Sequence, residues 1–166
     1  ELESTSDNVI KLHAGDAISG SLFFTLFKGE ADAALMNEIC FDAFVLGNHE
    51  FNEGDKGVAK FIDFLKSEKC STSVLAANIK PEVGVSALTP NSETDYIQPY
   101  SIIEKGGMKI GIIGIDIVRK TIMSSSPDET TKFLDEAETS QKIVNELKKS
   151  GVKHIILLTH YGYENE

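Results

Sequence analysis

Short apolar runs alternate with segments of helical spacing along most of this chain. The runs predict strands at residues 9–13, 43–46, 73–77, 100–104, 108–115 and 152–159. Gly106 and Gly107, between the fourth and fifth runs, predict a hairpin. Strands that alternate with helices are typical of an α/β protein, here with a mainly parallel central sheet and one antiparallel hairpin.

Three segments between the runs have apolar residues at helical spacing. The first opens after Gly29, and its predicted inner face is Ala31, Leu35 and Ile39. The second begins at Gly54 and Asp55, and its predicted stripe is Val58, Phe61, Ile62 and Leu65. The third ends before Gly151 and is marked by Phe133, Ala137, Val144 and Leu147. Residues 80–99 and 124–128 have no apolar period and predict loops.

Composition places the chain among soluble globular proteins and excludes several partners. Of the 166 residues, 41% are hydrophobic and 25% are charged, which is enough to bury a core over a one-domain length. The net charge of −10 excludes a general nucleic-acid binder or a binder of anionic membranes. No apolar run approaches a membrane span, and residues 1–8 lack the order of a signal peptide. The cysteines, Cys40 and Cys70, can be free or paired.

Polar side chains stand where the predicted strands end, and they carry the candidate chemistry. They are Asp16, Asn48, His49, Asn78, Asp116 and His160. Functional groups gather at the carboxyl ends of parallel strands. A carboxylate, an amide oxygen and an imidazole together suit Mn, Fe, Co, Zn or Mg. Two such cations roughly 3.5–4 Å apart can clamp a phosphoryl group and activate water.

Each of these residues also has an ordinary structural interpretation. An Asp after a strand can cap a helix or form a turn, and Gly47 with Asn48 can form a tight turn. Asn78 and Asp116 are predicted to belong to turns, and His13 and His154 to be structural. We expect Phe23, Phe24 and Phe27 to pack within a helix rather than to stack on a base. Spacing alone leaves metal chemistry and structural roles both open.

Three blocks resemble, in order, signature blocks of the calcineurin-like metallophosphoesterases. They are Gly15-Asp16, Gly47-Asn48-His49-Glu50-Phe51 and Thr159-His160-Tyr161-Gly162. Residues 12–24, 75–79 and 112–116 are similar to the bacterial 5′-nucleotidase family, and residues 24–27 and 124–127 to its NAD-cleaving branch. The resemblance implies an α/β/β/α sandwich and metal-dependent hydrolysis of nucleotide phosphate esters or anhydrides. It further implies an AMP-like or NAD substrate and a periplasmic, secreted or cell-surface enzyme of nucleotide catabolism.

Carried over residue by residue, the resemblance assigns roles to five side chains. Asp16 would bridge two metals, Asn48 and His160 would bind the second metal, and His49 would be the catalytic histidine. Many relatives pair that histidine with an aspartate where this chain has Asn52, so we expect a lower pKa for His49. Relatives that act on 2′,3′-cyclic nucleotides also carry Asn there, which keeps a cyclic phosphodiesterase as an alternative. A non-catalytic binding or structural module is another.

Two blocks of the family pattern are not found in these 166 residues. They are the opening Asp-x-His and the closing Gly-His-x-His or Gly-His-x-Gln. The resemblance therefore implies that residues 1–166 are part of a metallophosphoesterase domain, incomplete at both ends, without the carboxyl-terminal substrate-binding domain. A complete enzyme would hold two divalent ions (Zn, Mn, Co, Fe or Mg). This chain alone would hold one weak site at most and would be inactive.

Overall fold

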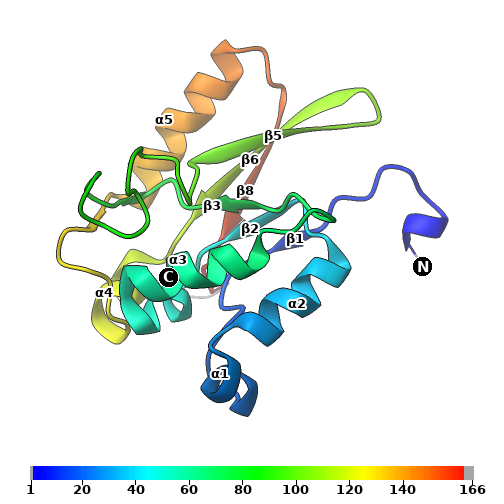
Figure 1. Cartoon of the computed structure of the whole chain (residues 1–166). Coiled ribbons are helices and arrows are strands. Elements are labelled where there is room, and N and C mark those ends of the chain that lie inside the picture. Colours follow the sequence, from blue (N-terminus) through cyan, green and yellow to red (C-terminus); the bar gives the residue numbers. More distant parts are fainter. Residues whose placement is uncertain (1, 163–166) are drawn as a thin grey trace.

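Two three-stranded sheets face each other in the computed structural model, which describes residues 2–162 (Figure 1). The first sheet has parallel strands in the order β1 (Leu12–His13), β2 (Ala43–Val45) and β3 (Ser73–Leu75). The second has the order β5 (Tyr100–Lys105), β6 (Met108–Ile115) and β8 (His154–Thr159). Strand β5 runs antiparallel to β6, and β8 runs parallel to it. Strands β4 (Ile79–Lys80) and β7 (Lys132–Phe133) form a small antiparallel pair.

Helices cover the outer faces of both sheets. Helices α2 (Glu30–Ile39) and α3 (Gly54–Leu65) lie on the first sheet, and α5 (Glu136–Lys149) lies on the second (Figure 1). The remaining helices are η1 (Leu2–Ser4), α1 (Leu22–Phe27), η2 (Asn48–Glu53) and α4 (Val118–Ser124). No helix within residues 2–162 is both long and apolar enough to cross a membrane.

The alternation of side chains along the inner strands separates three buried clusters. In β2, Phe44 packs with α3, whereas Ala43 and Val45 pack against the second sheet. In β6, Ile112 faces the first sheet and Ile113 faces α5. The molecule is thus a four-layer α/β/β/α sandwich, and this prediction is confirmed. The single central sheet expected from the alternation of elements is wrong, because alternation cannot show that residues 80–99 carry the chain from one sheet to another.

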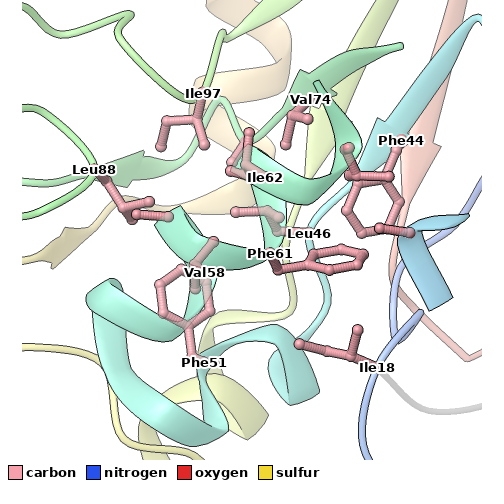
Figure 2. Close-up of a cluster of buried hydrophobic side chains, with 14 of the residues drawn as sticks. Ile18, Phe44, Leu46, Phe51, Val58, Phe61, Ile62, Val74, Leu88 and Ile97 are labelled. Atoms are coloured by element: carbon pink, nitrogen blue, oxygen red, sulfur yellow. The ribbon is translucent and has the colours of Figure 1, made fainter. Parts of the chain in front are cut away.

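Helix α3 forms as its sequence predicts. All four apolar residues of its predicted stripe are buried, and Figure 2 shows three of them directed into the cluster that includes Phe44 of β2: Val58, Phe61 and Ile62. The hairpin of β5 and β6 is also confirmed, with Gly106 and Gly107 at positive φ between the strands.

Two of the three predicted helix faces are partly wrong. Helix α2 buries Ala33 and Met36, whereas Leu35 and Ile39 are 69% and 48% exposed. The small Ala33 lies in the same cluster as Phe61 of α3, so α2 turns this residue inward instead of its bulkier stripe. Of the four residues predicted for the third helix, Val144 and Leu147 of α5 pack against the second sheet as expected, whereas Phe133 belongs to β7 and Ala137 is exposed.

The aromatic residues of α1 do not pack as expected. Phe23 and Phe27 stack on one another with ring centroids 6.4 Å apart and remain exposed, and α1 contains no buried residue. Only Phe24 reaches the core cluster, as a partly buried side chain. A six-residue helix presents too few faces to bury all three rings.

Cys40 and Cys70 form a disulfide, which answers the question that the sequence left open. The bond joins the end of α2 to the segment that precedes β3, across 30 residues of chain. A cross-link of this span restricts the unfolded chain far more than the folded one.

We expect loss of this disulfide to lower the free energy of unfolding by about 3–4 kcal/mol. Urea denaturation of the wild type with and without a reducing agent measures the effect. The double variant Cys40→Ala/Cys70→Ala should match the reduced wild type and should not respond to the reducing agent. Equal stability of the oxidised and reduced wild type would contradict the expectation.

Candidate functional site

Three loops bring Asp16, His49 and His160 together at one edge of the sandwich. Asp16 follows β1, His49 lies in η2 after β2, and His160 follows β8. His160 Nε2 lies 3.1 Å from Asp16 Oδ2, and the His49 backbone N–H donates to Asp16 Oδ1 at 2.9 Å. His49 Nε2 lies 4.0 Å from Asp16 Oδ2. The carboxylate of Asp16 therefore contacts residues from two other segments of the chain.

Asn48 begins η2 and is buried, with 5% of its surface exposed. Asn48 directly precedes His49 in the chain, so one predicted metal ligand and the predicted catalytic histidine are adjacent residues. The structure thus places Asp16, His49 and His160 in one site, with Asn48 beside them.

Two glycines allow the loops to approach so closely. A Cβ atom on Gly47 would lie 2.5 Å from Asp16 Oδ1 and 2.9 Å from His160 Cε1. A Cβ atom on Gly15 would lie 2.6 Å from His160 Nδ1, and the φ of +91° at Gly15 also favours glycine. The close approach of the three loops therefore requires glycine at both positions, because a larger residue would overlap Asp16 or His160.

Glu50 fixes the loop that carries Asp16 against the loop that carries His49. Its buried carboxylate accepts hydrogen bonds from the backbone N–H groups of Asp16 at 2.9 Å, Ala17 at 2.7 Å and Gly47 at 2.7 Å, with Ile18 at 3.4 Å. Burial raises the pKa of Glu50 to about 7, and these N–H donors oppose the rise. Glu50 had no predicted role of its own, although it belongs to the Gly-Asn-His-Glu block.

Asp16 and His160 form an ion pair that stabilises the charged form of each. The hydrogen bond that His160 donates to the Asp16 carboxylate raises the pKa of His160 to about 9, although partial burial opposes the rise. Partial burial disfavours the ionised form of Asp16, but hydrogen bonds from His160 and His49 outweigh it and lower its pKa. His160 Nδ1 donates to the backbone oxygen of Ala14 at 2.6 Å, which holds the ring with Nε2 toward Asp16.

This ion pair predicts a pH dependence for the metal-free protein. Because the folded pKa of His160 lies above its ordinary value, its stabilisation is fully present below about pH 6.5 and is lost as the pH rises through about 9. Both side chains are partly exposed, so we expect a loss of only about 1–2 kcal/mol. Urea denaturation with a chelator at pH 6, 7.5 and 9.5 measures it. An unchanged pH dependence in Asp16→Asn would contradict this origin.

His49 is held by contacts to its Nδ1 atom. Ser19 Oγ lies 3.1 Å from Nδ1, and Asn52 Nδ2 lies 3.0 Å from it. Ser125, from the loop after α4, lies 3.2 Å from Asn52 Oδ1 and donates to the backbone oxygen of Asn48 at 2.6 Å. The structure therefore places Asn52 against His49, as the sequence blocks led us to expect. The sequence offered no spacing from which the contacts of Ser19 and Ser125 could be inferred.

Asn78 and Asp116 form a buried connection between the segments that follow β3 and β6. The Asn78 amide binds the backbone oxygen and N–H of Asp116 at 2.9 and 3.0 Å. The Asp116 side chain is fully buried, which raises its pKa to about 7, and its Oδ2 accepts from Thr121 Oγ1 at 2.7 Å. The turn predicted for Asn78 is confirmed, but it is a buried turn. The turn predicted for Asp116 is wrong, because Asp116 directly follows β6 and lies buried outside any turn.

Within residues 2–162, neither of the other histidines shares a hydrogen bond or ion pair with Asp16, His49 or His160, although His13 lies close enough for the charge of His160 to act on its pKa. His13 packs edge-on against Phe41 and Phe44, and burial lowers its pKa, in keeping with a structural residue. His154 begins β8, at the other end of that strand from His160, and is exposed.

The donor set at the site fits a divalent cation. Within residues 2–162 no group of three His, Cys, Asp or Glu side chains is arranged to hold a metal. The predicted set, however, has one carboxylate, one imidazole and the amide of Asn48. Asp16 and His160 already lie 3.1 Å apart, and the bond to Ala14 orients the imidazole as metal-binding histidines are oriented in proteins. The arrangement can therefore offer oxygen and nitrogen donors to one cation.

Comparison with known proteins gives no matching family model, but it does identify relatives along the whole chain. The chain is 42% identical over 163 residues to a probable 5′-nucleotidase of Treponema pallidum, and this match covers 98% of the chain and 26% of the relative. It is 46% identical over 164 residues to the NAD 5′-nucleotidase of Haemophilus influenzae, with coverage of 99% and 25%. The chain thus spans about a quarter of the length of these curated relatives.

Comparison with solved structures identifies the same kind of protein as the sequence comparison does. The structure of Haemophilus influenzae NAD nucleotidase superposes with a TM-score of 0.86 at 46% identity, over 98% of this chain and 30% of that one. A calcineurin-like phosphoesterase from Bacillus subtilis superposes with a TM-score of 0.67 at 22% identity, over 99% of this chain and 52% of that one, and shows the same fold.

Proposed function

Because the chain is homologous over its whole length to one segment of the 5′-nucleotidases, we propose that the protein containing it hydrolyses nucleotide phosphate esters or anhydrides. The observation that carries this proposal is that His49 and His160 both contact the carboxylate of Asp16. The segment covers the loops that carry these residues. It accounts for about a quarter of the relatives' length, so we further propose that the active protein includes other catalytic residues and a separate substrate-binding domain.

Asp16, Asn48 and His160 are the residues that would hold divalent cations. Cations at such a site supply positive charge for the phosphoryl group and make a bound water more acidic. Asp16 would contribute its two oxygens, with Oδ1 also fixed by the His49 N–H. Glu50 and the two glycines keep these donors converged. Zn, Mn, Co, Fe and Mg are all compatible with the donor types.

His49 would act on the phosphoryl group itself. Its side chain is 47% exposed and its Nε2 faces the carboxylate of Asp16, where the cation would lie. When it is also protonated at Nε2, the ring can donate a hydrogen bond from this position to a phosphoryl oxygen or to the leaving group. Asn52, Ser19 and the backbone of η2 hold the ring in that orientation.

NAD and AMP are the substrates that the names of the relatives favour. A 2′,3′-cyclic-nucleotide phosphodiesterase is the second candidate, because Asn52 replaces the aspartate expected beside His49. A non-catalytic binding module is the third, since the site gathers only part of a dinuclear ligand set. The disulfide between Cys40 and Cys70 supports a periplasmic, secreted or cell-surface location, where such bonds persist.

A substrate panel separates these candidates. Phosphate and nucleoside release from AMP, NAD and 2′,3′-cyclic AMP would be measured with Mn²⁺ and with EDTA, on the longest natural protein that contains this chain. We expect cation-dependent hydrolysis of AMP or NAD that exceeds hydrolysis of the cyclic substrate. Preference for the cyclic substrate would favour the second candidate. No turnover of any of them, with Mn²⁺ bound, would contradict the proposed activity.

A further inference from the structure

The hydroxyl of Ser125 contacts two oxygen atoms but carries only one hydrogen. Its Oγ lies 2.6 Å from the backbone oxygen of Asn48 and 3.2 Å from Oδ1 of Asn52. A backbone carbonyl can only accept, and its contact is the shorter one. The single hydrogen of Ser125 therefore goes to Asn48, and the Ser125 oxygen remains free to accept from Asn52.

This hydrogen count decides how the Asn52 amide is oriented. The two ends of an amide have nearly the same shape, so hydrogen-bond partners determine which end faces which neighbour. An oxygen facing Ser125 would meet an acceptor, whereas the NH₂ group there would donate to it. The NH₂ group of Asn52 therefore belongs against Ser125, and its oxygen belongs against Nδ1 of His49, the atom 3.0 Å from the other end of the amide.

We propose that Ser125 is a positioning residue that makes Asn52 a hydrogen-bond acceptor and so places the hydrogen of the neutral His49 ring on Nδ1. The His49 Nδ1–H then donates to Asn52, and Ser19 Oγ, 3.1 Å from Nδ1, can accept from the same group. The lone pair of Nε2 faces Asp16 and the region where a phosphoryl group would bind. With the opposite amide orientation, Nδ1 would accept and the hydrogen would lie on Nε2.

This arrangement gives the loop after α4 a function in a site formed by other segments. Ser125 lies 73 residues from Asn52 along the chain, and its shorter hydrogen bond joins it to the backbone oxygen of Asn48. Where an aspartate would accept from the histidine by its chemistry alone, the amide of Asn52 accepts only if a third group fixes its direction. The inference about catalysis rests on the proposed phosphohydrolase function, whereas the hydrogen position does not.

The experiment reads the hydrogen position directly. In this chain labelled with ¹⁵N-histidine and freed of metal, the ¹⁵N shifts of the neutral His49 ring distinguish a protonated from an unprotonated nitrogen. We expect the Nδ1–H form in the wild type, and a shift toward the Nε2–H form in Ser125→Ala. Ser125→Thr should retain the Nδ1–H form. Ser124→Ala is the matched control and should match the wild type, because within residues 2–162 that neighbouring hydroxyl bonds only to Lys120 O in α4.

Asn52→Asp tests whether Ser125 acts through the amide. A carboxylate accepts from either oxygen, so we expect Ser125→Ala to leave the Nδ1–H form unchanged in the Asn52→Asp background. An Nε2–H form in the wild type, or an Nδ1–H form that survives Ser125→Ala with Asn52 present, would overturn the inference. In kinetics, Ser125→Ala should lower kcat about 10-fold at constant KM, and Asn52→Asp should remove that dependence. Failure of nucleotide hydrolysis with the expected ¹⁵N shifts would reject the proposed function and leave the positioning role intact.

Discussion

Replacing Glu50 with alanine is expected to lower the free energy of unfolding by about 3–5 kcal/mol. Its carboxylate is fully buried and accepts from backbone N–H groups on two loops. Alanine leaves these donors without a partner and out of contact with water, which is more costly than losing an exposed hydrogen bond. Urea denaturation followed by circular dichroism measures the loss.

Two further variants make the Glu50 prediction specific. Glu50→Gln keeps one acceptor oxygen but turns an NH₂ group toward N–H donors, so we expect about half the loss of Glu50→Ala. Glu53→Ala is the matched control, since Glu53 belongs to the same short helix but is exposed and bonds Lys28 Nζ at 2.6 Å. It should cost less than about 1 kcal/mol. Wild-type stability of Glu50→Ala would show that Glu50 does not hold the loops together.

Gly47→Ala is expected to weaken Mn²⁺ binding by about 10–100-fold, a loss typical of changes to the support of a metal ligand. The φ of −108° at Gly47 is open to alanine, so the effect comes from contact alone. The new methyl group would overlap Asp16 Oδ1 and crowd His160 Cε1, so the carboxylate and the imidazole must separate. Calorimetric titration with Mn²⁺ measures the affinity. In the metal-free protein, the pKa of His160 should also fall from about 9 toward its ordinary value.

Gly20→Ala provides the control for Gly47→Ala. Gly20 follows the Asp16 loop at a φ of +72°, with open space where a Cβ would lie. Alanine there should cost about 1 kcal/mol of stability and should leave Mn²⁺ affinity unchanged. Equal Mn²⁺ affinity in Gly47→Ala and the wild type would mean that the close approach of the loops is not needed for the cation.

The spacing of apolar residues correctly predicted the elements whose packing depends mainly on their own sequence. Helix α3 has four apolar residues at helical spacing, and all four are buried. The hairpin of β5 and β6 needed only two strands and a glycine pair. The inner face of α2 was not predictable in this way, because Ala33 is buried by its fit to α3 and not by its own hydrophobicity. The separation into two sheets likewise depends on pairings between segments far apart in the chain.

The site residues likewise fall into those that the sequence predicted and those that it did not. Position at strand ends identified Asp16, His49 and His160, since parallel strands bring their carboxyl ends together. Glu50 and Ser125 were missed, because their roles consist of hydrogen bonds to backbone groups on other loops. Such bonds leave no periodic signal in the sequence. The turn predicted for Asp116 was wrong for the same reason, because the burial of Asp116 depends on the packing of both sheets over it.

The central claim is that these loops form one cation-dependent phosphohydrolase site in which His49 acts on the phosphoryl group. The most direct test measures kcat for the preferred nucleotide in the wild type and in His49→Ala, on the longest natural protein that contains this chain, with saturating Mn²⁺. We predict a fall in kcat of about 10²–10⁴-fold, with Mn²⁺ affinity within a factor of about 3 of the wild type. Undiminished kcat in His49→Ala would contradict the claim.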